Sequence, residues 1–82
     1  MEVKVLGPGC AKCKKLYEEA DNVIKQLGVP ATLTKVEKLS EIAAYNVLMT
    51  PALVINGQVK VAGRVPSAAE LANLLTTAAA QS

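Results

Sequence analysis

The feature that most constrains the fold is a long amphipathic helix with a clear end, placed early in the chain. Between Ala11 and Leu27 the apolar residues recur at helical spacing, at Leu16, Ala20, Val23, Ile24 and Leu27. Gly28 and the Val29-Pro30 pair that follows it supply the stop. This apolar stripe needs a partner surface, and a chain of 82 residues has room for one core. We therefore expect one domain over residues 1–82 and no second domain.

Strands are predicted on both sides of this helix. They lie over Glu2–Leu6, Ala31–Glu37, Ala52–Ile55 and Val59–Ala62. Gly7-Pro8-Gly9 ends the first strand, since glycine and proline interrupt regular structure. Asn56-Gly57 joins the last two strands, and this pair favours a type I′ turn with positive φ at both residues. The last two strands therefore form an antiparallel hairpin.

A short second helix is predicted over Leu39–Tyr45. Its expected buried face is made of Leu39, Ile42 and Ala43. Ser40 is its candidate cap, and Asn46 can take the left-handed conformation that ends a helix.

The chain is expected to end in a third helix. Ser67 and Glu70 have the spacing of a capping box. An apolar stripe follows at Leu71, Leu74, Leu75 and Ala78, and Gln81 and Ser82 are expected to fray. The resulting order, β-α-β-α-β-β-α, predicts an α/β fold with helices packed on a small mixed sheet.

Composition excludes several kinds of chemistry. The chain has no histidine, so triads, dyads and zinc sites that need an imidazole are excluded. Two cysteines cannot complete a four-thiolate metal site within one chain. A net charge of +2 and 2% aromatic residues argue against nucleic-acid binding. We see no targeting segment, and Thr50 and Pro51 interrupt the apolar run from Val47 to Ile55, so we expect a cytoplasmic protein that does not bind membranes.

Cys10-Ala11-Lys12-Cys13 lies where the first strand's loop enters the long helix, the setting in which C-x-x-C is a redox motif. Cys10 falls at the exposed helix start, whereas Cys13 continues the apolar stripe. Unpaired N–H groups at a helix N-terminus stabilise a thiolate, so Cys10 is the expected nucleophile, with the lower thiol pKa. Cys13 is placed to resolve the mixed disulfide. The alternatives are two inert thiols or half of a metal site shared between chains.

Lysines surround this motif. Lys12, between the cysteines, is the candidate for tuning the thiol pKa, because a nearby cation favours the thiolate. Lys14 and Lys15 have the same charge at the same helix end, but solvated surface lysines are the commoner explanation for them.

Met49-Thr50-Pro51-Ala52 is the second notable motif, because a proline that opens a strand cannot donate a ladder hydrogen bond. With it, the chain resembles the thioredoxin/glutaredoxin superfamily over nearly its whole length, and most closely the small archaeal and bacterial thioredoxin-like redox-active disulfide proteins. The resemblance rests on Cys10-Ala-Lys-Cys13, Thr50-Pro51, the Asn56-Gly57 hairpin and Gly63 before the last helix.

The resemblance implies a thioredoxin-like fold and a substrate site. In the four-stranded mixed sheet, the first and third strands would be central and helices would cover both faces. Pro51 would be cis, although an ordinary trans proline is the commoner case elsewhere. The backbone of Thr50 would pair with an extended substrate segment beside the cysteines. Gly63 would let a substrate backbone approach, although a plain turn glycine explains it almost as well.

The chain also departs from the family. Its Gly9-Cys10-Ala11-Lys12-Cys13 segment matches neither the thioredoxin nor the glutaredoxin motif, and Ala62-Gly63-Arg64-Val65 replaces the segment with which glutaredoxins hold glutathione. The acid that thioredoxins bury beneath the disulfide has no equivalent, since the inward residues of the first strand are Val3 and Val5.

The function that we expect is thiol–disulfide exchange. The chain would reduce disulfide-containing proteins as a monomer, without a cofactor or metal, and a flavoprotein disulfide reductase or another dithiol donor would recharge it. Two other hypotheses stay open, a soft-metal chaperone that uses both thiolates and a non-catalytic interaction module with the same fold.

Overall fold

A computed structural model of the chain describes residues 1–81. Its elements are β1 (Glu2–Leu6), α1 (Ala11–Leu27), β2 (Thr32–Val36), α2 (Leu39–Ala43), β3 (Ala52–Ile55), β4 (Gln58–Ala62) and α3 (Ala68–Gln81). This is the predicted order of strands and helices, so the α/β fold class is confirmed. None of these helices is long and apolar enough to cross a membrane.

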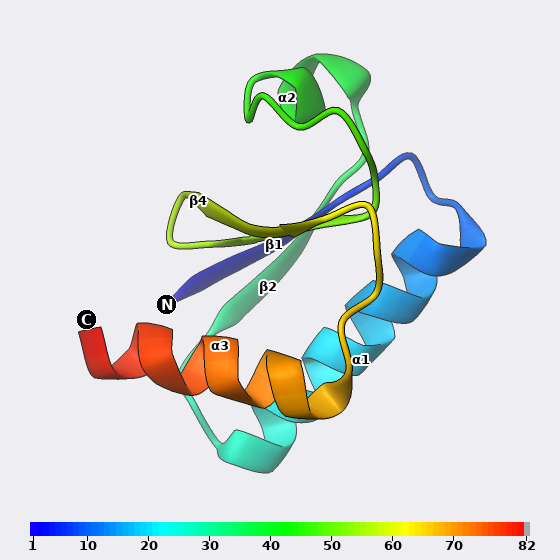
Figure 1. Ribbon diagram of the computed structural model, residues 1–82. Coiled ribbons are helices and arrows are strands. Elements are labelled where there is room, and N and C mark those ends of the chain that lie inside the picture. The colour runs from blue at the N-terminus through cyan, green and yellow to red at the C-terminus, as the bar shows by residue number, and fades with distance from the viewer. Residues whose placement is uncertain (82) are drawn as a thin grey trace.

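The four strands form one mixed sheet in the order β2-β1-β3-β4. β1 pairs in parallel with β2 and antiparallel with β3, and β3 pairs antiparallel with β4. β1 and β3 are therefore central, as the resemblance implied. Figure 1 shows α2 on one side of this sheet and α1 and α3 on the other, so helices cover both faces.

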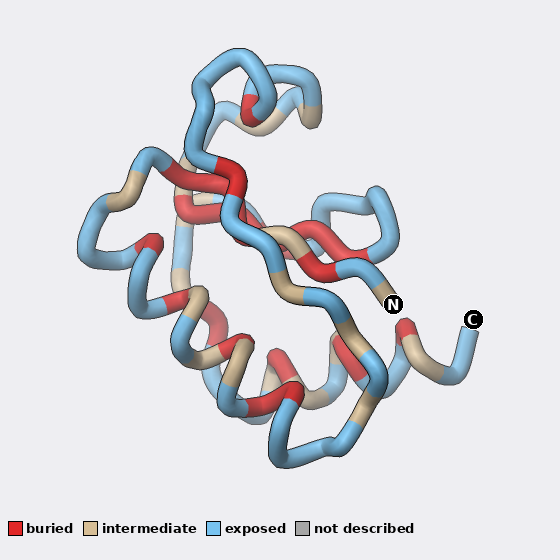
Figure 2. Tube along the Cα trace, turned by 180° about the vertical axis from the view of Figure 1, so that it is seen from behind, coloured by how far each residue is buried: buried red, intermediate tan, exposed pale blue. Residues whose placement is uncertain are grey.

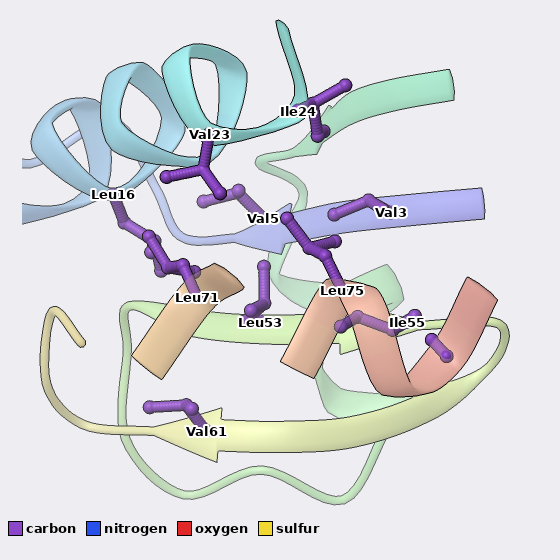
Figure 3. Close-up of a cluster of buried hydrophobic side chains, with 11 residues drawn as sticks. Val3, Val5, Leu16, Val23, Ile24, Leu53, Ile55, Val61, Leu71 and Leu75 are labelled. Carbon is purple, nitrogen blue, oxygen red and sulfur yellow. The ribbon is translucent and has the colours of Figure 1, made fainter. Parts of the chain in front are cut away.

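The larger core lies between the sheet and the pair α1 and α3 (Figure 3). The sheet and both helices contribute to it: Val3, Val5, Leu53, Ile55 and Val61 from strands, Leu16, Val23 and Ile24 from α1, and Leu71, Leu75 and Ala78 from α3. The stripe predicted for α1 is buried except at its end, where Leu27 is 39% exposed. This core fixes α1, and with it the cysteine motif, on the sheet.

The opposite face has a smaller core, and here the predictions were partly wrong. Ile42 is buried with Leu6, Val36, Ala52 and Val54, but Leu39 is 73% exposed and Ala43 is also exposed. Figure 2 shows a single buried stretch in this segment. α2 ends at Ala43 rather than Tyr45, so a helix of five residues can bury only one position of its face.

The caps of the helices also differ from the predictions in part. Lys38, not Ser40, is the N-cap of α2, and it makes no side-chain capping bond. At α3, Ser67 Oγ accepts a hydrogen bond from Glu70 N–H at 3.2 Å, which is half of the predicted capping box. Gly28 ends α1 with φ 67°, as expected. Asn46 has the expected left-handed conformation, with φ 59°, but the C-cap of α2 is Ala44, which is right-handed.

The hairpin turn lies where the sequence predicted it, and the ends of the neighbouring elements differ from the predictions by one residue or a few. Asn56 and Gly57 both have positive φ, which confirms the type I′ turn, and β4 begins one residue earlier than predicted. β2 is one residue shorter than predicted at each end. α3 is helical through Gln81, so the fraying expected there is not seen, and Ser82 lies outside the described residues.

Candidate active site

Cys10 and Cys13 sit at the junction that the sequence predicted, where the loop after β1 enters α1 (Figure 1). Cys10 is the N-cap residue, with extended backbone dihedrals, and Cys13 lies in the first turn. The two residues form a disulfide, with their Cα atoms 5.0 Å apart. Cys13 N–H donates a hydrogen bond to Cys10 Sγ at 3.2 Å, so the sulfur of Cys10 satisfies one of the open N–H groups of the helix.

The two cysteines differ in their access to solvent. Cys10 is exposed, whereas Cys13 is 5% exposed and lies one turn before the buried Leu16. Solvent therefore reaches Cys10 far more than Cys13. A helix N-terminus carries about half a positive charge, which stabilises an anion on the capping sulfur.

Gly7 makes room for the buried cysteine, a role that sequence reasoning missed. A Cβ atom at Gly7 would overlap with Cys13 Sγ, and would lie 3.9 Å from the Cβ of Thr50. Gly7 N–H donates a hydrogen bond to the carbonyl oxygen of Val36 at 2.9 Å, which holds its backbone in place. Its position directly after β1 and three residues before Cys10 was the available signal, but the sequence shows only that a glycine ends the strand.

The lysines of the motif are all exposed. Lys12, Lys14 and Lys15 lie in and beside the first turn of α1, and this turn has no acidic residue. Positive charge therefore gathers at a helix end that is already positive, an arrangement that is unfavourable for the helix and favourable for a thiolate.

The Thr50-Pro51 peptide bond is cis, as the resemblance implied. Pro51 is buried, and its carbonyl oxygen accepts a hydrogen bond from Gly63 N–H at 2.8 Å. Thr50 is half-buried and lies near Gly7, which itself backs onto Cys13. The loop before β3 and the loop after β1 thus meet beside the cysteine pair.

Gly63 has a positive φ of 84°. The space beside its Cα, where a side chain would stand, is bordered by Met49. A Cβ atom at Gly63 would lie 3.1 Å from the Met49 Cβ and 3.2 Å from its sulfur. Met49 is nonetheless 63% exposed, and the neighbouring Leu48 is 99% exposed. An exposed apolar loop therefore stands beside Thr50 and covers Gly63.

Arg64 fixes the segment that follows Gly63. Its Nη1 and Nη2 donate to Glu70 Oε1 and Oε2 at 2.7 and 2.6 Å, a two-pronged contact with the first turn of α3. The hydrogen bonds from Arg64 lower the pKa of Glu70 below its ordinary value, and the same contact raises the pKa of Arg64.

Glu37 is a second residue that sequence reasoning did not identify. It follows β2 directly and lines a small pocket together with Cys13. The available signal was topological: β1 and β2 are parallel, so the segments that follow both strands leave the sheet at the same edge, where the cysteines lie. Within residues 1–81, no group of three or more potential metal-binding His, Cys, Asp or Glu side chains is present.

A four-stranded sheet with an exposed sulfur capping the first helix, a buried sulfur one turn later and a cis-proline loop beside them defines a thiol–disulfide exchange protein. The family model described as "Thioredoxin domain" matches residues 1–76. The chain belongs to the thioredoxin family and is a thioredoxin-type thiol–disulfide oxidoreductase.

Two archaeal relatives support this assignment. The thioredoxin of Methanothermobacter thermautotrophicus is 32% identical over 76 residues, which cover 93% of this chain and 99% of the relative. The thioredoxin of Methanocaldococcus jannaschii is 32% identical over 69 residues, which cover 84% of this chain and 79% of the relative. The likeness therefore extends over the whole domain and not only over the cysteine motif.

Proposed function

We propose that residues 1–82 act as one unit that reduces disulfide bonds in proteins, with Cys10 as the nucleophile and Cys13 as the resolving thiol. One observation carries this order of attack. Cys10 is exposed and its sulfur accepts the Cys13 N–H at the start of α1, whereas Cys13 is 5% exposed. Access and the charge of the helix end both favour a thiolate on Cys10 that can meet a large substrate.

The reaction proceeds in two exchanges. The Cys10 thiolate attacks one sulfur of the substrate disulfide, a bond forms between the two, and the second substrate sulfur leaves as a thiolate that takes up a proton. Cys13 then loses its proton and attacks Cys10 Sγ. The Cys10–Cys13 disulfide forms, the bond to the substrate breaks, and the first substrate sulfur leaves. The substrate gains two electrons, and the cysteine pair loses them.

Lys12 is the proposed tuning residue for this pair. It is exposed beside Cys10 at a helix end without an acidic residue, so its charge adds to that of the open N–H groups. Lys14 and Lys15 contribute in the same direction over a longer distance through solvent.

Thr50, Pro51 and Gly63 are the proposed substrate contacts. A backbone at Thr50 can pair with an extended substrate segment, since the loop is anchored by the hydrogen bond from Gly63 N–H to the Pro51 carbonyl. Met49 lies against Gly63, so its side chain must move before a substrate backbone can reach that glycine. Met49 and Leu48 then offer exposed apolar surface to the substrate.

The partners follow from this chemistry. Each turnover leaves the cysteine pair oxidised, so a flavoprotein disulfide reductase or another dithiol donor has to return two electrons. No bound cofactor takes part, because the sulfur pair carries both electrons. We place this cycle in the cytoplasm, where thiols are kept reduced, with the protein as a monomer.

The order of attack is tested by trapping. Reduced Cys13→Ser should accumulate a mixed disulfide at Cys10 when it is mixed with an oxidised protein substrate, whereas Cys10→Ser should accumulate none. Mass spectrometry of the acid-quenched mixture measures both. In parallel, the wild type should accelerate insulin reduction by dithiothreitol and Cys10→Ser should not.

Two results would contradict the proposal. Equal trapping by both variants would remove the distinction between nucleophile and resolving thiol. A wild type that gives no acceleration over dithiothreitol, and that instead binds zinc or Cu(I) tightly, would replace reduction with the soft-metal chaperone hypothesis.

A further inference from the structure

Three lysines beside Cys10 make no ion pair within residues 1–81. Lys12, Lys14 and Lys15 are exposed in and next to the first turn of α1, and that turn has no acidic residue. We call these three residues the lysine rim. Three other cations of the chain are paired with acids: Lys4 with Glu2, Lys25 with Asp21 and Arg64 with Glu70. The charges of the rim are therefore available to a charge on another molecule.

The loops that border the cysteine pair do not offset the rim. Residues 7–10 and 46–52 contain no charged side chain. Arg64, in the segment before α3, donates from both of its terminal nitrogens to the Glu70 carboxylate, so this charge is already matched. The loop that carries Thr50 is thus neutral, and the charge beside Cys10 comes from the start of α1.

The acids of α1 lie farther from Cys10 than the rim does. A helix rises about 1.5 Å per residue, so the rim lysines start about 3–8 Å along the axis from Cys10, whereas Glu18 and Glu19 start about 12–14 Å from it. Charges in solvent are screened over about 8 Å at physiological ionic strength. Glu37 and Lys35, which line the pocket beside Cys13, have opposite charges. A molecule that approaches Cys10 therefore meets the positive rim first.

The rim faces both sides of the start of α1. Lys14 lines the small pocket that also contains Gly9 and Cys13, on the side of β2. Lys15 lines a separate groove with residues 65–68, the segment that follows Gly63 on the way to α3. A substrate segment that extends past Cys10 in either direction therefore runs beside a lysine of the rim.

We propose that the lysine rim favours disulfides whose flanking residues are Asp or Glu, so that acidic protein segments are the preferred substrates. The inference rests on the proposed function, because the rim acts only on a substrate that comes to Cys10. Opposite charges speed the encounter, since exposed charges act mainly on the rate of association. The bonds that form and break are those of the two exchanges, and the rim takes no part in them.

The test uses three peptides with the same intrachain disulfide. Their flanking residues are glutamate, glutamine or lysine. Reduced protein is mixed with each peptide at about pH 7, and acid quenching followed by chromatography gives the second-order rate constant of reduction. Each rate constant is divided by that of the same peptide with dithiothreitol, a dithiol without other charged groups, which corrects for the reactivity of the disulfide itself. The measurements are made at about 0.02 M and about 0.5 M salt.

Two double variants are compared with the wild type. Lys14→Gln/Lys15→Gln removes two charges of the rim and keeps Lys12, the proposed tuning residue. Lys25→Gln/Lys60→Gln is the matched control, because it removes two charges from the last turn of α1 and from β4. A change in the thiol pKa of Cys10 would slow all three peptides alike, so the ratio of the acidic to the basic peptide reports the preference alone.

In the wild type we expect the acidic peptide to be reduced about tenfold faster than the basic one at low salt, with a smaller ratio at high salt. Lys14→Gln/Lys15→Gln should lower this ratio by about threefold or more, because two of the three charges of the rim are gone. Lys14→Glu/Lys15→Glu should reverse the preference. The control should keep the ratio of the wild type.

Three results would overturn the inference. Equal corrected rates for the three peptides at low salt would show that the site has no charge preference. A ratio that stays unchanged in Lys14→Gln/Lys15→Gln would show that the rim is not its source. A control that lowers the ratio as much as the rim variant would assign the preference to the net charge of the protein. A wild type that reduces none of the peptides contradicts the proposed function itself.

Discussion

The two faces of the sheet are stabilised unequally. On the face covered by α1 and α3, the sheet and the two helices bury eleven residues of the described chain in one cluster (Figure 3). On the opposite face, α2 contributes one residue, Ile42, to a cluster of five. We call the first of these the thick face and the second, which lies under a helix of five residues, the thin face.

Residues from both sides of the sheet contribute to the candidate active site. Cys13 belongs to the thick face, because α1 holds it one turn from Leu16. Thr50 and Pro51 follow the segment that leaves α2 on the thin face, in which Leu48 and Met49 are exposed. The sulfurs are thus held on the side with the larger buried cluster, and the loop proposed to bind substrate is joined to the side with the smaller one. Local opening costs least where few apolar residues are buried, so we expect the loop at Thr50 to open more easily than the segment that holds the cysteines.

The largest expected effect comes from emptying each core in turn. Leu71→Ala should destabilise the fold by about 3–5 kcal/mol, because Leu71 is fully buried between α3, α1 and the sheet. Ile42→Ala should cost about 2 kcal/mol, since the short α2 can settle into the space. Urea unfolding of both variants and the wild type measures the difference.

The activity of the Ile42→Ala variant tests the same difference between the two faces. In the folded fraction of Ile42→Ala, the release of the first thiolate from a small disulfide should keep its rate, because Cys10 is held by α1. Reduction of insulin should fall, because the loop at Thr50 loses its support. If Ile42→Ala destabilises the protein as much as Leu71→Ala does, the two faces do not differ in stability as their buried clusters imply.

A smaller effect is expected at the contact between the two loops, in Gly7→Ala. The new methyl group would overlap with Cys13 Sγ in the disulfide form, so the sulfur or the loop has to shift. In the reduced form the Cys13 side chain can rotate away. We expect a loss of about 1–3 kcal/mol in the oxidised protein and a smaller loss in the reduced protein, measured by urea unfolding of each form.

Gly28→Ala is the matched control. Gly28 has φ 67° and no atom within 4 Å of its missing Cβ, so alanine there meets strain but no sulfur. Its cost of about 1–2 kcal/mol should be equal in the two redox forms. An equal cost for Gly7→Ala in both forms would mean that Gly7 serves the backbone alone and has no part in placing Cys13.

Sequence reasoning succeeded where a local pattern decides the structure. The period of α1, the Asn56-Gly57 turn and the position of the cysteine motif are set by neighbours in the chain, and all were predicted. The cis state of Pro51 came from the family resemblance, since no local pattern indicates it.

The failures have a physical pattern too. Gly7 against Cys13, Met49 over Gly63 and Glu37 in the pocket are contacts made by tertiary packing. Spacing along the chain does not encode which side chain fills the space beside a glycine. At α2, propensity suggested a longer helix with a three-residue buried face, but the thin face of the sheet offers contact for Ile42 and leaves Leu39 in solvent.

The smallest expected effects are electrostatic. They involve a carboxyl with a lowered pKa on one face of the sheet and a lysine with a raised pKa on the other. On the α3 side, Arg64 pairs with Glu70 and lowers the pKa of that carboxyl. On the α2 side, Lys4 Nζ donates to the Tyr45 hydroxyl at 3.2 Å and lies 3.2 Å from Glu2 Oε1, and these contacts raise the pKa of Lys4. All of these groups are at the surface, where ion pairs contribute little and salt weakens them further.

The direction of each shift fixes the pH range in which each contact counts. A carboxyl with a lowered pKa in the folded state stabilises the protein above the pKa of the unfolded chain, so the Glu70 contribution is lost as the pH falls through its folded pKa. A lysine with a raised pKa stabilises below the unfolded value, so the Lys4 contribution is lost as the pH rises through its folded pKa. Glu70→Gln should therefore flatten the acid arm of a plot of Tm against pH and leave the alkaline arm unchanged, while Lys4→Met should do the reverse. High salt should shrink both differences. A Lys4→Met variant that leaves the alkaline arm unchanged would show that the contacts of Lys4 do not stabilise the fold.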